Sequence, residues 1–426
     1  MDPHQPFSVF KCCTMLKRIH YRRSGLVLSG IIVCALVFVK CVDPAKDHPG
    51  PTAQAEYSQY AGSRTCAGCH KNIYESHIHT PHYLTSQKST ESNIRGSFLD
   101  GKNKFMYDQD VYVVAEKRPD GLFQVEYVNG TEKISRPIDI TIGSGKIGQT
   151  FLYWDRNRLF QLPLTYFTPL DQWTNSPGFS NRVVYRRPIT SRCLECHGTY
   201  FQKLSDEKTE PEDFSKENII YGVDCEKCHG PAARHADFHE KNPGEKKGQY
   251  IIDPKGFTRQ QSLDMCRLCH GGRLAKTRPS FTFRAGDSLA NFFAIHSTAP
   301  PPGATIDAHG NQYGMLASSK CFAKSQMTCG TCHSPHENET TKLELFSQRC
   351  MSCHNTTHNN FCKIVDRTGY DITKNCIDCH MPEMASKSIM VLLQGETVPA
   401  AASMRSHLIT VYPEETKKFL AIKKKK

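Results

Sequence analysis

The chain has 426 residues, enough for two or three domains, and only 38% of them are apolar. It contains 20 cysteines, and its formal net charge at neutral pH is +12. Such a charge could suit a nucleic-acid or membrane-surface binder, but residues 1–40 alone hold six Lys or Arg against one Asp. Composition therefore does not establish a general basic surface, and the cysteines are the stronger signal.

The N-terminal segment, residues 1–41, has the pattern of an export signal or membrane anchor. A positively charged flank precedes an apolar run from Gly25 to Val39, which is short for a spanning helix and typical of a signal-peptide core. The flank predicts a cytoplasmic N-terminus and export of the rest of the chain. Cys41 lies where a lipoprotein cysteine would lie, although Lys40 fits that signal poorly, so a signal anchor and a lipid at Cys41 both remain open. Residues 42–62 are polar and Pro-rich, which predicts a tether.

One pattern, Cys-x-x-Cys-His, occurs seven times in the remainder of the chain. Two thiols three residues apart lie on one side of a helical turn, where both can add to the vinyl groups of one porphyrin, and the next histidine can ligate its iron. This pattern is the attachment site of c-type haem. Structural zinc is a poor alternative, because paired zinc knuckles do not require a histidine after each one. We predict seven covalent haems, bound by Cys66, Cys69 and His70; Cys193, Cys196 and His197; Cys225, Cys228 and His229; Cys266, Cys269 and His270; Cys329, Cys332 and His333; Cys350, Cys353 and His354; and Cys376, Cys379 and His380.

Seven haems would also account for the composition. Each is a large apolar body that side chains can wrap, and each oxidised haem with two ionised propionates adds about one negative charge. We therefore expect the loaded protein to be much less positive than its sequence, with no nucleic-acid partner.

Residues 63–97 are predicted to form the first haem segment. The first motif runs into NIYESHIHTPHYLTSQ, which we expect to be helical. A first haem motif followed by a Tyr-containing helix and a ligand histidine resembles the cytochrome c-554 family, and the Cys-His-Met-Pro ending of the last motif resembles cytochromes related to hydroxylamine oxidoreductase. The resemblance implies helices and loops wrapped around a haem stack. It also implies His82 as a distal ligand, with His79 as the nearer alternative.

Residues 98–185 carry no haem motif and predict a small antiparallel β insertion between haems 1 and 2. Residues 123–128 alternate and meet Asn129-Gly130, a strong hairpin signal. Residues 138–142 alternate before a Gly-Ser-Gly turn, and the apolar runs on either side of residues 155–158 predict another hairpin. The predicted fold class is therefore mainly α and irregular, wrapped around a haem stack, with this β insertion.

Residues 186–410 are predicted to form a six-haem domain, and residues 411–426 a solvated basic tail. Related multihaem cytochromes place a distal ligand at the position of His235, and His239 lies one turn further along the same helix face. Each of His336 and His358 follows a motif histidine too closely to reach the same iron from the opposite face, so we expect each to ligate a neighbouring haem. Further candidate ligands are His296, His309 and His407. Cys321 and Cys362 lie outside every motif and could form a disulfide or remain buried thiols.

Beyond residue 41, enough histidines remain outside the motifs for bis-His coordination of every iron. Bis-His iron is six-coordinate and exchanges electrons without offering a substrate position. We predict a membrane-anchored, periplasmic electron carrier that serves donor and acceptor proteins. The alternative is an oxidoreductase with one open haem acting on hydroxylamine or nitrite. Pentahaem nitrite reductase is not favoured, because no Cys-x-x-Cys-Lys motif occurs.

Overall fold

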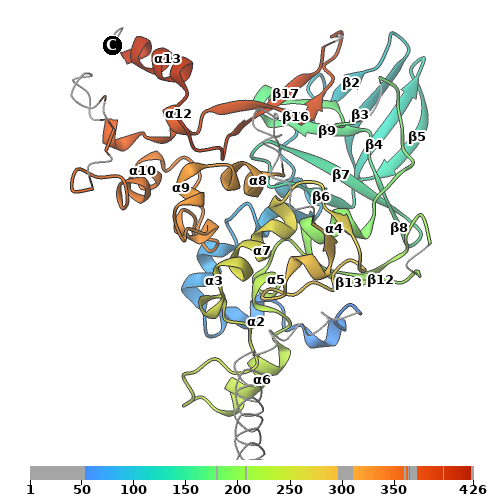
Figure 1. The fold of residues 1–426 in the computed structure, drawn as a ribbon. Coiled ribbons are helices and arrows are strands. Elements are labelled where there is room, and N and C mark those ends of the chain that lie inside the picture. Colours follow the sequence, from blue (N-terminus) through green and yellow to red (C-terminus); the bar gives the residue numbers. More distant parts are fainter. Residues whose placement is uncertain are drawn as a thin grey trace, which may run out of the picture. The chain divides into compact units, whose positions relative to one another are not determined.

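The computed structural model describes residues 53–178, 181–206, 209–295, 310–358, 361–362, 364, 372–396 and 398–423 (Figure 1). The chain divides into two compact units, Met1–Pro49 and Gly50–Lys426, and every described residue belongs to the second. The predicted signal or anchor segment, His296 and His309 lie outside the described residues. Within the described ranges, no helix combines the length and the apolar character needed to cross a membrane.

The first haem segment is built from short helices and turns. It contains α2 (Ser63–Ala67), α3 (Lys71–His77), η2 (Tyr83–Thr85), β1 (Ser86–Lys88) and η3 (Glu91–Asn93), and it is preceded by η1 (Tyr57–Gln59), which lies in the segment predicted as a tether. The expected helix is shorter than predicted, because Pro81 disfavours helical backbone at the residue before it. His79 and His82 therefore follow the helix instead of lying on it.

Two antiparallel sheets occupy the next part of the chain. The first is a four-stranded meander, β2-β3-β4-β5, and the second is seven-stranded, with β1-β6-β7-β8-β11 as its main path and with β9 joining β7 to β10. The hairpin predicted at Asn129-Gly130 is confirmed, with both residues at positive φ, and so is the hairpin at residues 155–158. The elements are β2 (Lys104–Met106), β3 (Val111–Arg118), β4 (Gly121–Val128), β5 (Thr131–Pro137), β6 (Ile140–Ile142), β7 (Gly148–Asp155), β8 (Arg158–Gln161), β9 (Leu164–Phe167), η4 (Thr168–Leu170), β10 (Gln172–Asn175) and β11 (Arg187–Pro188).

The remaining motifs lie on short helices that alternate with further hairpins. The helical elements are α4 (Ser191–His197), α5 (Cys225–His229), α6 (Ala233–Lys241), η5 (Pro254–Gly256), α7 (Arg259–His270), η6 (Leu289–Asn291), α8 (Gln312–Ala317), α9 (Lys320–Ala323), η7 (Cys329–Thr331), α10 (Leu343–Met351), η8 (Ile372–Lys374), α12 (Ile377–His380) and α13 (Pro413–Lys423). The hairpins are β12 (Gly198–Lys203) with β13 (Phe214–Tyr221), β14 (Ala275–Lys276) with β15 (Phe293–Ala294), and β16 (Glu383–Val391) with β17 (Ala400–Arg405).

The predicted fold class is wrong in its proportions. The structure has 29% helix and 26% strand, so it is a mixed fold with several antiparallel sheets and not a mainly helical wrapping. Three hairpins lie among the later motifs, where helices and loops were expected. Their strands pair across segments, and packing between distant residues decides strand formation more than local preference does.

The sheets hold part of the haem-binding region in place. Leu194, between the two cysteines of the second motif, is buried against Ile140, Leu152 and Leu159 of the seven-stranded sheet. At the other end of the chain, Val391 and Ala402 of the β16–β17 hairpin are buried against Phe167 of β9. The first contact packs the second motif against the seven-stranded sheet, and the second packs the hairpin that follows the seventh motif against β9.

Candidate haem-binding site

Each motif forms the helical turn that its spacing predicts. In four of the motifs the histidine N–H donates to the carbonyl of the first cysteine, over 2.8, 3.0, 2.9 and 3.2 Å for His70, His333, His354 and His380. The other three motifs lie within α4, α5 and α7. The i to i−4 bond puts the first cysteine and the histidine on one face of the turn. No disulfide links any of the described cysteines.

The Nδ1 atoms of several motif histidines face hydrogen-bond acceptors from other segments. A carbonyl can only accept, so Nδ1 must donate to Ile252 and to Thr410, which leaves the Nε2 lone pair of each ring for a metal. Such a partner fixes both tautomer and ring orientation. The contacts are His229 to the Ile252 oxygen at 2.9 Å, His380 to the Thr410 oxygen at 2.9 Å, His270 to Gln312 Oε1 at 3.2 Å, and His197 to Thr85 Oγ1 at 3.0 Å.

Three motif histidines lie opposite a histidine from elsewhere in the chain. A ligating nitrogen lies about 2.0 Å from its metal, so two rings on opposite sides of one iron have centroids roughly 6 Å apart. The observed pairs have this separation: His229 and His336 at 6.1 Å, His270 and His82 at 6.1 Å, and His333 and His407 at 6.2 Å. The residues present therefore fit an iron porphyrin between each pair.

In the ring that each pair draws from outside the motifs, burial favours the neutral form that ligates metals. Desolvation, followed by the neighbouring His270, lowers the pKa of His82 to about 4. Desolvation, followed by the neighbouring His333, lowers the pKa of His407 to about 4. Burial also lowers the pKa of His336. A neutral imidazole keeps the lone pair that iron requires.

His77 is a buried histidine with a different role. Its ring centroid is 6.2 Å from that of His336, but its Nδ1 lies 3.2 Å from the Pro335 oxygen and its Nε2 lies 3.1 Å from the Val223 oxygen. Because both nitrogens face carbonyl oxygens, the ring links three segments of the chain and does not present a nitrogen to iron.

The other predicted distal histidines within the described residues differ from one another in exposure and in hydrogen-bond partners. On α6, His235 Nδ1 lies 2.7 Å from the Gln249 oxygen, while His239 Nε2 accepts from the Gln249 N–H at 3.4 Å. His79 is exposed, and only its carbonyl has a described contact, with Asn338. His358 is also exposed, and its Nδ1 lies 2.8 Å from Asn355 Oδ1 of its own turn.

Close approaches between thiols of different motifs show which motifs are neighbours in space. The first motif contacts the third through Cys66 and Cys225, and the second contacts the fourth through Cys196 and Cys269. The fourth contacts the fifth through Cys266 and Cys329, and the sixth contacts the seventh through Cys350 and Cys376. The spatial order of the motifs therefore differs from their order in the sequence.

The two cysteines outside the motifs lie near motif thiols. The electrostatic neighbours of Cys321 include Cys353 of the sixth motif and Cys332 of the fifth, and Cys362 is a neighbour of Cys379. Burial raises the pKa of the Cys321 thiol. Neither cysteine is in a disulfide, so the structure favours the predicted thiol over the predicted bridge.

Charged residues between the motif cysteines were not anticipated from the sequence. Glu226 of the third motif is buried and accepts from the N–H groups of Ala61, Gly62 and Ala232 at 2.8, 2.9 and 2.8 Å. Glu195 of the second motif is equally buried and binds Lys276 Nζ at 2.9 Å. The available signal was the placing of a glutamate between the two cysteines of a motif, as at Glu195 and Glu226.

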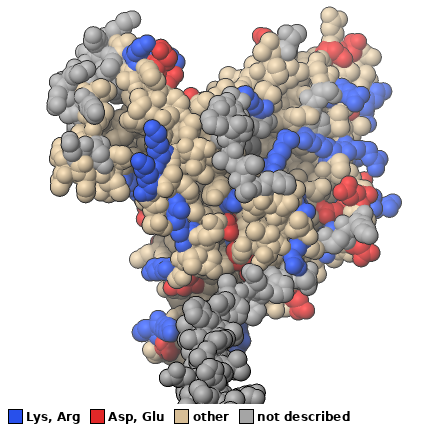
Figure 2. Space-filling view, in the orientation of Figure 1, with Lys and Arg blue, Asp and Glu red and all other residues tan. Residues whose placement is uncertain are grey.

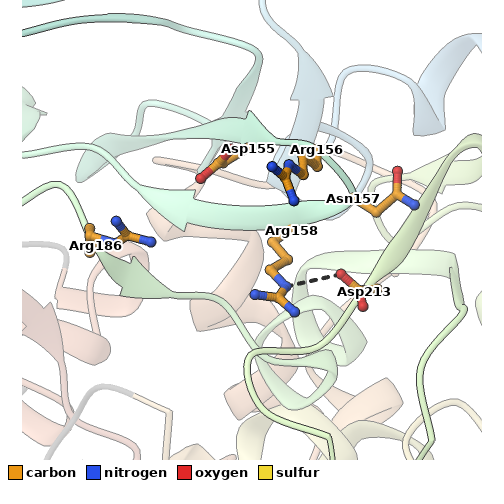
Figure 3. A pocket seen from close by; sticks show the side chains of 6 residues that line it. All are labelled: Asp155, Arg156, Asn157, Arg158, Arg186 and Asp213. Carbon is orange, nitrogen blue, oxygen red and sulfur yellow. Dashed lines mark hydrogen bonds and ion pairs between the residues drawn. The ribbon is translucent and has the colours of Figure 1, made fainter.

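A polar cavity of about 470 Å³ lies away from these groups, at the turn between β7 and β8 (Figure 3). It is lined by Asp155, Arg156, Asn157, Arg158, Arg186 and Asp213, and Arg158 Nε binds Asp213 Oδ1 at 3.1 Å. The lining includes neither cysteine nor histidine, so this cavity is not part of the haem-binding site.

Comparison with known proteins agrees with this chemistry. The family described as cytochrome c554 and c-prime matches residues 180–230, which include the second and third motifs. The solved structure of an outer cell wall cytochrome, OcwA, is similar with a TM-score of 0.52 and 16% identity, covering 84% of this chain and 81% of that one. No curated protein matches the sequence.

The seven motifs, the ring pairs and these similarities support a multihaem c-type cytochrome. Haem c, where bound, would supply one-electron iron chemistry, with the motif thiols as its attachment points and the imidazoles as its axial ligands.

Proposed function

We propose that this protein is an exported heptahaem electron carrier whose haems are mostly bis-His ligated. The three ring pairs are the observation that carries this proposal, because each combines a motif histidine with one from a distant segment. On this basis we assign His336 to the third haem, His82 to the fourth and His407 to the fifth. Iron with two imidazoles is low-spin and has no substrate position, which suits a carrier.

His235 is the best second ligand for the first haem. Helix α6, which carries it, lies beside η1, directly before the first motif. Its Nδ1 faces a carbonyl, so its Nε2 keeps the lone pair.

The thiol contacts support a path for the electrons. The first, third, fourth and fifth motifs would form a continuous row, since Cys228 of the third is an electrostatic neighbour of Cys266 of the fourth. The sixth and seventh would extend this row, because Cys332 of the fifth has Cys353 of the sixth as a neighbour. The second haem would branch from the fourth.

Export and membrane association follow from the N-terminal pattern of residues 1–41. The similar solved protein is described as an outer cell wall cytochrome, which suits an exported chain. We propose soluble or surface redox proteins as donor and acceptor. Positive and negative side chains both occur on the face seen in Figure 2.

The test is electron paramagnetic resonance of the oxidised protein together with carbon monoxide binding to the reduced protein. We expect low-spin signals in the unaltered protein and no spectral change with carbon monoxide. His336→Ala should convert about one haem per chain to a high-spin, carbon monoxide-binding form, because it removes one axial ligand. His79→Ala is the control and should leave the spectra unchanged. His79 is exposed, and its backbone oxygen contacts Asn338, two residues after His336.

A high-spin signal in the unaltered protein that responds to hydroxylamine or nitrite would overturn the carrier and favour the oxidoreductase. The haem number has its own measurement, since the intact mass must exceed that of the polypeptide by seven haems.

A further inference from the structure

Four charged side chains gather where the second, third and fourth motifs meet. They are Arg192 and Glu195 of α4, Lys227 of α5 and Lys276 of β14, and we call them the junction cluster. The Glu195 side chain is only 1% exposed and that of Lys276 18%. The cluster is partly buried around this carboxylate, and charges act more strongly on their neighbours there than in water.

Lys227 links the third motif to the second. Its Nζ donates to the carbonyl oxygens of Glu195 at 2.7 Å and Gly198 at 3.0 Å, on either side of Cys196 and His197. Its hydrogen bonds within the described part of the chain go to carbonyl oxygens, not to carboxylates. The Lys227 ammonium therefore lies beside the second motif without a direct bond to a described carboxylate.

Arg192 links the second motif to the fourth. Its Nη2 donates to the Leu268 oxygen at 2.9 Å, between the cysteines of the fourth motif, and its Nη1 lies 3.1 Å from Cys196 Sγ. Both Arg192 and Lys227 are electrostatic neighbours of Cys196 and Cys269, the thiols through which the two motifs meet.

The positive charges outnumber the negative one. Glu195 accepts from Lys276 through both oxygens, at 3.0 and 2.9 Å, and also from Arg192 at 3.0 Å and from the Phe281 N–H at 2.8 Å. The junction cluster thus holds one carboxylate and three cations, two of which bind that carboxylate, so its positive charges exceed its negative charge by two.

We propose that the junction cluster raises the reduction potential of the haems on the second and fourth motifs. This inference rests on the proposed electron carrier. An oxidised haem would take one electron from a neighbouring reduced haem, which becomes oxidised in turn. No bond is made or broken, and the accepting haem becomes more negative by one charge. A nearby excess of positive charge favours that form, and low polarity strengthens the effect. Electrons would then accumulate on the second and fourth haems, where the proposed path branches.

The test is spectroelectrochemical titration of the full, haem-loaded chain and two variants of one residue. Lys227→Gln keeps a donor for the two carbonyl oxygens but removes the charge, whereas Lys227→Arg keeps the charge. We expect the glutamine variant to move the high-potential end of the titration to lower potential, and the arginine variant to titrate like the unaltered protein. Lys241→Gln, which removes an exposed charge paired with Asp237 on α6, is the matched control and should shift nothing.

A downward shift in both Lys227 variants would overturn the proposal, because it would assign Lys227 a purely structural role. The absence of a shift in both would also overturn it. Arg192→Gln removes a second charge of the cluster and should give the same downward shift even if Lys227→Gln binds haem poorly. Failure of the carrier itself would be seen separately, as high-spin iron in the unaltered protein.

Discussion

Backbone oxygens orient some of the motif histidines, and the residues that carry these oxygens cannot be recognised from the sequence. His229 is oriented by the backbone oxygen of Ile252, and His380 by that of Thr410. Any residue type supplies such an oxygen, so the sequence could predict the motif histidines but not their partners. The same holds for His82, whose place opposite His270 depends on a tertiary contact between segments nearly two hundred positions apart.

Gly222 allows its segment to lie close to the segment that holds His82 and Tyr83. It has a φ of +67°, and a Cβ there would collide with the Tyr83 carbonyl oxygen, beside the segment that holds His82. The Val223 N–H also donates to the His82 oxygen at 2.9 Å. We expect Gly222→Ala to lower the free energy of unfolding by roughly 3 kcal/mol and to release His82 from the fourth haem.

Gly130→Ala is the matched control for this prediction. Gly130 has a similar φ of +73°, but a methyl group added there would meet no atom within 4 Å, so its cost should be about 1 kcal/mol of backbone strain. Denaturant unfolding and the high-spin signal distinguish the two variants. Equal unfolding midpoints would show that the approach to Tyr83 is unimportant.

At the level of elements, local signals predicted the hairpins in the β region and missed those among the motifs. Asn129-Gly130 specifies its turn by residue type alone. Strands β12 and β13 lack such a turn, and their register shifts at bulges, so the alternation that would reveal them is interrupted. In this part of the sequence the clearest local signal is the helical spacing of the motifs. The mixed fold was therefore predicted to be mainly helical.

Helix α6 offers a discriminating test, because it carries two candidate ligands one turn apart. His235 donates from Nδ1 to the Gln249 oxygen and keeps Nε2 for iron, whereas His239 Nε2 accepts from the Gln249 N–H. We expect His235→Ala to produce about one high-spin haem per chain, and His239→Ala to leave every haem low-spin. Electron paramagnetic resonance measures both, and the reverse result would make His239 the ligand.

At the scale of the molecule, the motifs predicted what is bound but not the order in which the haems lie. Counting Cys-x-x-Cys-His predicts the number of attachment sites, because the chemistry depends on local spacing. The contacts of the first motif with the third, and of the second with the fourth, depend on how the chain folds back. A path inferred from sequence intervals alone would therefore join the wrong neighbours.

The charge of the whole molecule provides the last prediction. The sequence has a net charge of +12 and an isoelectric point of about 8.8. Seven oxidised haems with ionised propionates would remove about seven positive charges, and reduction of each haem would remove one more. We expect the reduced, haem-loaded protein to focus at a lower pH than the oxidised, haem-loaded protein, because each haem gains one negative charge on reduction. A Cys350→Ala, Cys353→Ala variant, which lacks one attachment site, should focus at a higher pH than the unaltered protein. If this variant instead focused at the same pH as the unaltered protein, the haem would not carry the negative charge that we assign to it.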